Sequence, residues 1–106
     1  MVTAVNKEVL TGTTAKISCN VTGLTAALKT VKWEKSDGTD VTNGFPGYTS
    51  NDGVYDHGSQ TTTLTVDGEL NSADSTYNCL ITPSNQDDAT EVSTAVTLSV
   101  FSKFIN

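Results

Sequence analysis

The two cysteines of this chain each lie inside a run in which apolar and polar residues alternate. In an extended strand successive side chains point to opposite faces, so alternate residues share a face. The faces that contain the cysteines carry Ala15, Ile17, Cys19 and Val21 on the first run, and Tyr77, Cys79 and Ile81 on the second. We therefore expect two strands, far apart in sequence, whose apolar faces meet across one core.

Cys19 and Cys79 are free thiols, part of a metal site, or the two halves of a disulfide. The matched alternation around them, with no third cysteine and no histidine nearby, favours the disulfide. Such a bond closes a loop of roughly 60 residues and stabilises the fold by roughly 4 kcal/mol on a chain-entropy model. Disulfides persist in oxidising compartments, so we expect an extracellular protein.

The length of 106 residues suits one domain with one core. Threonine and valine are frequent, and Gly, Asn and Asp separate the apolar runs, which favours strands and turns over helices. The stretch 23–28 is the most helix-like and is too short for a stable helix. Met1 is followed by no signal-peptide pattern, and no apolar run is long enough to insert into a bilayer. We expect a module taken from a longer mature protein.

The formal net charge is −6, and the basic residues are six lysines without any arginine. Nucleic-acid binding depends on Lys/Arg clusters, so nucleic acid is not an expected partner. Anionic membrane surfaces are disfavoured for the same reason. The single histidine, His57, lies in a loop rich in Gly and Asp, without the further groups that a catalytic or metal site needs. We expect neither enzymatic activity nor a cofactor.

Alternation and turn residues predict strands along most of the chain, at 2–10, 14–21, 30–35, 60–66, 77–83 and 90–101. One or two short edge strands are expected at 48–50 and 54–55, on either side of a turn at 51–53. In the strand 77–83, Asn78, Leu80 and Thr82 are expected to point outward. In the last strand we expect Val92, Thr94, Val96, Leu98 and Val100 to point inward. Short strands at this spacing predict an all-β, two-sheet sandwich.

Four segments together resemble the immunoglobulin superfamily, and the resemblance covers nearly the whole chain. They are Gly12-x-x-x-x-Ile17-x-Cys19, Val31-Lys32-Trp33-Glu34-Lys35, Leu64-x-Val66 and Tyr77-x-Cys79. The resemblance implies an immunoglobulin-like sandwich of the I-set or V-like type with one inter-sheet disulfide. It also implies a core built on Ile17, Trp33, Leu64 and Tyr77, with Trp33 packed on the bridge and the Tyr77 hydroxyl bonded to the backbone upstream.

Two departures from the family pattern limit the assignment. The aspartate that usually precedes the Tyr-x-Cys segment is shifted by one place to Asp74, and the arginine that commonly pairs with it is absent. The last strand also lacks the Phe-Gly-x-Gly element of antigen-receptor variable domains. An antigen receptor is therefore not expected.

The resemblance implies an extracellular recognition or adhesion module of a larger cell-surface or secreted protein. Such a module binds a protein partner, homophilic or heterophilic, through the exposed face of the sheet that contains Trp33 and Tyr77. The expected contact residues are Lys32, Glu34, Asn78 and Leu80, with Asn85 and Asp87 in the loop 84–89. The alternative is a structural spacer in an extracellular tandem-repeat array, since 35–42 and 60–66 resemble modules repeated in large invertebrate extracellular proteins. Neighbouring modules are expected, with the domain at 1–101 and a connector at 102–106.

Two further patterns are candidates for sites. Asn20-Val21-Thr22 is an N-glycosylation sequon, and its asparagine should point outward on the sheet that does not contain Trp33. The pairs Asp37/Asp40, Asp87/Asp88 and Asn51/Asp52 carry oxygen ligands that calcium binds. None of these pairs has the loop spacing of an EF-hand, so we interpret them as turn residues.

Overall fold

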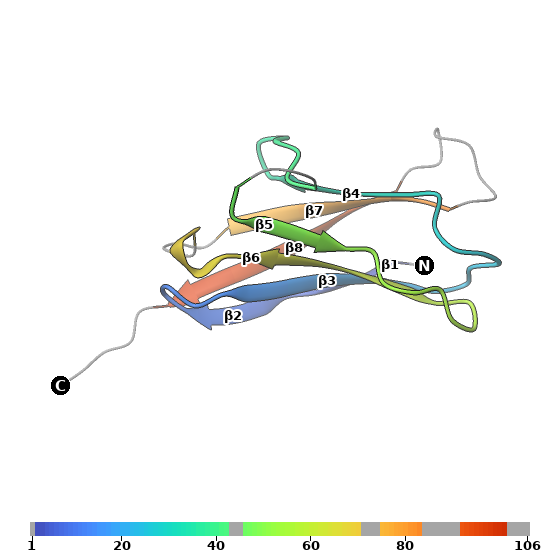
Figure 1. Ribbon diagram of the computed structural model, residues 1–106, viewed down its shortest axis with the longest axis horizontal. Helices are drawn as coiled ribbons and strands as arrows, with labels where there is room; N and C mark the ends of the chain where they lie inside the picture. Colours follow the sequence, from blue (N-terminus) through green and yellow to red (C-terminus); the bar gives the residue numbers. More distant parts are fainter. Residues whose placement is uncertain (1, 43–45, 71–74, 84–91, 102–106) are drawn as a thin grey trace.

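The computed structural model describes residues 2–42, 46–70, 75–83 and 92–101. Its elements are β1 (Val2–Val5), β2 (Lys7–Leu10), β3 (Ala15–Val21), β4 (Thr30–Lys35), β5 (Tyr48–Asn51), β6 (Gln60–Val66), the short 3₁₀ helix η1 (Gly68–Leu70), β7 (Ser75–Thr82) and β8 (Val92–Phe101). The strands form two four-stranded sheets, in the orders β1-β3-β6-β5 and β2-β8-β7-β4 (Figure 1). The predicted two-sheet sandwich is confirmed. Within the described ranges, no helix is both long and apolar enough to span a membrane.

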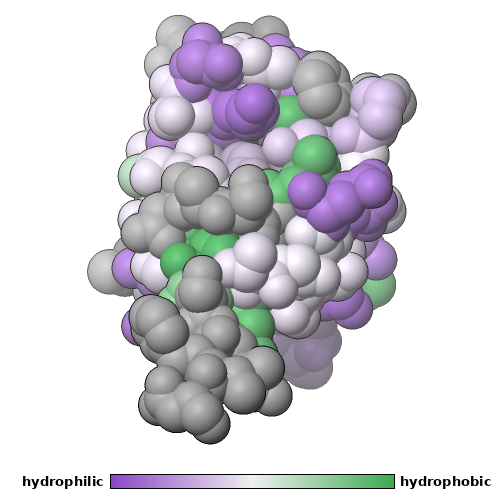
Figure 2. All heavy atoms as spheres, turned by 90° about the vertical axis from the view of Figure 1, so that its left-hand side faces the viewer, coloured by the Kyte–Doolittle hydropathy of each residue, from purple (hydrophilic) through white to green (hydrophobic). Residues whose placement is uncertain are grey.

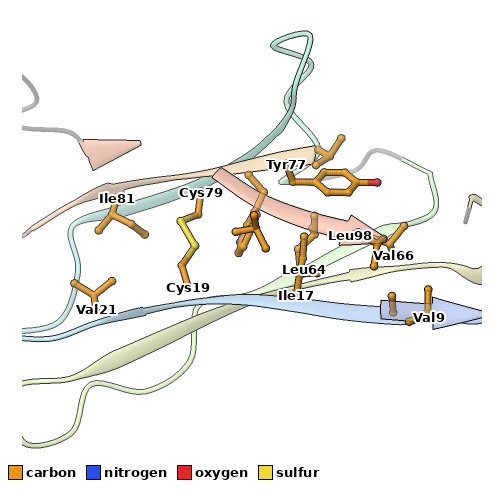
Figure 3. Close-up of a cluster of buried hydrophobic side chains, with 14 residues drawn as sticks. Val9, Ile17, Cys19, Val21, Leu64, Val66, Tyr77, Cys79, Ile81 and Leu98 are labelled. Atoms are coloured by element: carbon orange, nitrogen blue, oxygen red, sulfur yellow. A yellow bond between two sulfur atoms is a disulfide. The ribbon is translucent and has the colours of Figure 1, made fainter. Parts of the chain in front are cut away.

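The core lies between the two sheets and is joined by a disulfide between Cys19 on β3 and Cys79 on β7. Both cysteines are fully buried, and apolar side chains from both sheets surround the bond (Figure 3). Trp33, the neighbour of Cys79 across the β4–β7 pair, is also fully buried. The disulfide prediction is confirmed. Other buried side chains are Ala15, Ile17, Val21, Leu64, Val66, Tyr77, Ile81, Val96 and Leu98.

The prediction of a single N-terminal strand over 2–10 is wrong, because the segment divides between the sheets. β1 pairs antiparallel with β3, and β2 pairs parallel with β8. Val2 and Ala4 pack against the core from even positions, whereas Val9 is buried at an odd position. One uninterrupted strand would point one of these sets outward, so the chain must change sheet between them. The change occurs at Asn6, whose Oδ1 accepts a hydrogen bond from the Thr97 backbone N–H at 2.9 Å.

Of the one or two short edge strands predicted at 48–50 and 54–55, only the first is formed, as β5. After β5, Gly53 adopts a φ of 73° and its backbone lies close to the Thr61 carbonyl, which directs the chain away from β6. Asp56 and Ser59 then exchange two backbone hydrogen bonds of 2.8 and 3.0 Å around a two-residue turn. The turn residues His57 and Gly58 both have positive φ, as a type I′ hairpin requires.

Two side-chain directions at the ends of strands differ from the prediction. Thr82 was expected outward but is 2 % exposed; it is the last residue of β7, and its carbonyl accepts a hydrogen bond from the Lys29 N–H. Val92 was expected in the core but is 44 % exposed, because it is the first residue of β8 and lies at the end of the sandwich. At the end of β7 and the start of β8, alternation therefore predicted the wrong face for these two residues.

Candidate partner-binding face

The residues expected to bind a partner occupy two neighbouring cross-strand rows on the outward side of the β2-β8-β7-β4 sheet. Each row takes one residue from β4, one from β7 and one from β8. We call this surface the β7 face, and its rows are Lys32, Leu80 and Ser93, followed by Glu34, Asn78 and Ala95. The predicted contacts Asn85 and Asp87, and the pair Asp87/Asp88, lie outside the described residues.

The β7 face has Leu80 at its centre and the charged residues Lys32 and Glu34 on β4. Lys32 is exposed, whereas Glu34, Asn78 and Leu80 are half-buried. Side chains directly opposite each other on neighbouring strands lie about 4.5–5.5 Å apart at Cβ, so Lys32 and Ser93 flank Leu80 on both sides. The half-burial of Leu80 was not predicted, because it depends on which residues β4 and β8 place beside it.

Strand β4 is held at its outer edge by the segment that follows it. The Val41 N–H donates to the Trp33 carbonyl at 2.9 Å, and the Trp33 N–H donates to Thr42 Oγ1 at 2.8 Å. Asp37 and Asp40 stabilise the turns of this segment. Asp37 Oδ1 accepts a hydrogen bond from the Thr39 N–H, and Asp40 Oδ1 accepts one from the Thr42 N–H.

These hydrogen bonds lower the pKa of both aspartates. The side-chain and backbone hydrogen bonds from Thr39 hold the pKa of Asp37 below its usual value. The corresponding bonds from Thr42 do the same for the pKa of Asp40. Both carboxylates therefore take part in turns, and the described part of the chain contains no group of three or more His, Cys, Asp or Glu side chains suited to a metal ion.

Beneath the β7 face, polar groups of the core are paired across the two sheets. The Trp33 indole Nε1–H donates to Thr62 Oγ1 on β6 at 3.1 Å. Sequence reasoning missed this partner, although a buried indole N–H usually finds an acceptor and Thr62 shares the inward face of β6 with Leu64 and Val66. The pairing ties the sheet that carries the β7 face to the opposite sheet.

Tyr77 is buried and meets the Tyr48 ring edge-on, with centroids 6.1 Å apart. Burial and the hydrogen bond with Tyr77 raise the pKa of Tyr48. The backbone acceptor predicted for the Tyr77 hydroxyl lies upstream, where residues 71–74 fall outside the described part of the chain. Tyr77 is thus a core residue of β7, two positions before the disulfide-bonded Cys79.

The outward side of the other sheet carries mostly hydroxyl and amide groups. Asn20 lies there between Thr3 on β1 and Thr61 on β6. Its Oδ1 accepts hydrogen bonds from Thr61 Oγ1 at 2.8 Å and from Ser59 Oγ at 3.3 Å. We call this surface the β3 face, and its residues are Thr3, Val5, Lys16, Ser18, Asn20, Thr49, Asn51, Thr61, Thr63 and Thr65.

His57 lies at the hairpin turn and pairs only with its neighbour. Its Nδ1 is 2.5 Å from Asp56 Oδ1, and the two side chains are 93 % and 76 % exposed. A contact between two neighbouring side chains in open solvent contributes little to stability. A solvated loop histidine is the simplest description of this residue.

Comparison with solved structures supports the sandwich topology. A chimeric titin Z1Z2–Z1Z2 tandem functionalised with an exogenous GRGDS peptide from fibronectin is 18 % identical, with a TM-score of 0.55 over 95 % of this chain and 50 % of the other. A family 123 glycoside hydrolase from Clostridium perfringens is 7 % identical, with a TM-score of 0.53 over 93 % of this chain and 23 % of the enzyme. This chain thus spans half or less of either protein, and the likeness concerns the fold alone.

At the sequence level, no curated protein matches this chain. The Immunoglobulin I-set domain family does match, over residues 2–100. That range includes both cysteines, Trp33 and every strand of the two sheets except the last residue of β8, Phe101. The chain belongs to the immunoglobulin I-set family.

Proposed function

We propose that this domain recognises a protein partner through the β7 face, as an adhesion or recognition module of a larger cell-surface or secreted protein. The observation that carries the proposal is Leu80, an apolar side chain at the centre of a face whose edge carries Lys32 and Glu34. Binding interfaces commonly combine an apolar centre with a polar rim. The sheet that carries the β7 face is held to the opposite sheet by the disulfide and by the buried Trp33, so we expect the face to keep its shape without a partner.

The disulfide also supports an extracellular location. Cys19 and Cys79 are fully buried in the core and form a disulfide between the two sheets. Bonds of this kind form and persist in oxidising compartments. The proposed partner is therefore another extracellular protein or a second copy of this domain.

The charges of the β7 face favour a second copy. Lys32 and Glu34 are two residues apart on β4, so their side chains point to the same side. A two-fold axis that runs midway between the two rows and parallel to them brings Lys32 of one facing copy towards Glu34 of the other. The face is thus complementary to itself in charge, although the chain as a whole carries a net charge of −6.

The test uses two single variants, each of which places one negative charge on the outward side of one sheet. Leu80→Asp changes the centre of the β7 face, and Ser18→Asp is the matched control because Ser18 lies outward in the middle of β3. Beads coated with the wild-type chain are expected to aggregate, and Leu80→Asp is expected to weaken this aggregation at least tenfold. Ser18→Asp should leave it unchanged. Both variants should unfold near the wild-type temperature, since neither residue is in the core.

A second measurement covers a heterophilic partner. Adhesion of the cells that produce the parent protein is measured on surfaces coated with each variant. The proposal predicts loss with Leu80→Asp in at least one of the two assays and no loss with Ser18→Asp. Equal behaviour of the two variants in both assays would rule out the β7 face.

The second candidate function is a structural spacer, which the positions of the terminal strands favour. β1 begins towards one end of the sandwich and β8 ends at the other (Figure 1). Domains joined through such termini line up end to end, as in a tandem array. A spacer needs no partner on either face, so it predicts that Leu80→Asp and Ser18→Asp both leave adhesion of the parent protein unchanged.

A further inference from the structure

We propose that Asn20 is N-glycosylated and that the glycan covers the β3 face. Asn20-Val21-Thr22 is the only Asn-x-Ser/Thr sequence in the chain. The modification requires passage through a secretory pathway, which the extracellular location in the proposed function supplies. Binding through the β7 face is a separate claim, because it involves the opposite sheet.

The geometry of the Asn20 carboxamide suits a glycan. The side chain is partly exposed and points outward from β3, near the end of that strand. Both hydrogen bonds that fix it, from Thr61 Oγ1 and Ser59 Oγ, are accepted by Oδ1. The glycan is attached to Nδ2, which takes part in neither bond.

The same hydrogen bonds survive the modification. The donor is an oligosaccharide linked to a polyprenyl diphosphate. A bond forms between Nδ2 and the anomeric carbon of the first sugar, while the bond from that carbon to the diphosphate oxygen breaks. The diphosphate leaves with the electron pair, and Nδ2 loses one proton. The product is still an amide, so its Oδ1 still accepts from Thr61 and Ser59.

The surroundings of Asn20 give the glycan a surface to cover. Val5, at 52 % exposed one of the most exposed large apolar side chains, lies outward on β1, opposite Ser18. Asn20 is two residues from Ser18 on the same side of β3, so Val5 and Asn20 are diagonal neighbours. Sugar rings present C–H groups that cover apolar surface, and their hydroxyls hydrogen-bond to threonines such as Thr63. A glycan at Asn20 therefore removes the β3 face from contact with other proteins.

The test is expression of the whole chain through a eukaryotic secretory pathway with matched changes at one position. Thr22→Ser keeps the sequon, whereas Thr22→Ala removes it, and both leave Asn20 in place. Intact mass is measured before and after treatment with peptide N-glycosidase, and conversion of Asn20 to aspartate is located by peptide mapping. Wild type and Thr22→Ser are expected to carry a removable glycan at Asn20, and Thr22→Ala to carry none.

Wild-type and Thr22→Ser protein decide the result even if Thr22→Ala is secreted poorly. Correct folding is checked by the disulfide, from the change in electrophoretic mobility on reduction. Folded, secreted wild-type protein with an unmodified Asn20 overturns the proposal. That result leaves the aspartate test of the β7 face untouched, so the two claims fail separately.

Discussion

At the scale of single residues, the sandwich depends on polar side chains that satisfy each other inside the core. The clearest case is Thr62, which is fully buried and accepts the hydrogen bond of the Trp33 indole. Thr62 Oγ1 also lies 3.4 Å from the Asn51 carbonyl, to which it donates. Thr62 thus connects the buried tryptophan to the edge strand β5.

Thr62→Val keeps the shape of the side chain but removes the acceptor for the indole N–H. A buried donor left without a partner costs about 1–3 kcal/mol, so the free energy of unfolding should fall by about that amount. Thr63→Val is the control, because Thr63 lies on the outward side of the same strand. Urea unfolding followed by tryptophan fluorescence gives both values. Equal values for the two variants would mean that the Trp33–Thr62 bond contributes nothing.

The turn aspartates predict a pH dependence of stability. The pKa of Asp40 is lowered, first by its hydrogen bonds with Thr42, from an unfolded value of about 3.9. A carboxyl whose folded pKa is depressed stabilises the fold above the unfolded pKa, and this stabilisation is lost as pH falls through the folded pKa. Asp40→Asn keeps an oxygen acceptor but does not titrate in this range. The denaturation midpoint of Asp40→Asn should therefore fall less than that of wild type between neutral pH and acid, and an identical fall would contradict the assignment.

At the scale of strands, sequence alternation predicted the strand and its buried face wherever the same alternate positions are buried along the whole strand. β3 and β6 are buried at every second position, and their bounds were predicted to within one residue. In the N-terminal segment the core-facing residues switch from even positions, up to Ala4, to odd positions, at Val9. Alternation alone assigned this segment to one strand, because it does not show the change of sheet at Asn6. The same alternation predicted which residues share the β7 face, since direction on a strand is local.

The loop after β5 was not predictable in this way because long-range bonds hold it. The Gln60 side chain accepts from the Leu28 N–H and donates to the Asp52 carbonyl, and the Tyr55 hydroxyl donates to the Leu24 carbonyl. These hydrogen-bond partners lie up to about 30 residues away in sequence, and no local sequence pattern indicates them. The apolar pair at 54–55 was therefore interpreted as a strand.

Substitutions at two glycines with positive φ, Gly38 and Gly53, distinguish the cost of backbone strain from the cost of a steric clash. A Cβ at Gly38 meets nothing within 4 Å, whereas a Cβ at Gly53 lies 2.1 Å from the Thr61 carbonyl oxygen. Gly38→Ala should cost only the left-handed strain, about 1–2 kcal/mol. Gly53→Ala should cost clearly more, because the loop must also move away from β6. Thermal unfolding compares the two, and equal losses would contradict the close approach at Gly53.

At the scale of the whole molecule, the two sheets expose different surfaces. The β3 face carries mostly hydroxyls and amides, with Lys16 and the exposed Val5, whereas on the β7 face Leu80 lies opposite Lys32 and diagonal to Glu34 on β4. β1 begins towards one end of the sandwich and β8 ends at the other, so domains joined end to end through these strands leave the β7 face uncovered (Figure 1). Figure 2 shows the pole at which β8 ends, where apolar side chains lie among polar ones. Recognition through one face is compatible with a place in a tandem array.

The most direct test of the β7 face compares two exposed lysines that act as internal probes. Lys32 lies on the β7 face and Lys16 on the β3 face, so a bound partner protects only Lys32. Their rates of acylation are measured by mass spectrometry on chain-coated beads, first dispersed and then aggregated, and on chain-coated surfaces before and after cells adhere. The account predicts that acylation of Lys32 slows severalfold on contact while that of Lys16 keeps its rate. Slowing of Lys16 alone, or no slowing of Lys32 in either setting, would contradict it.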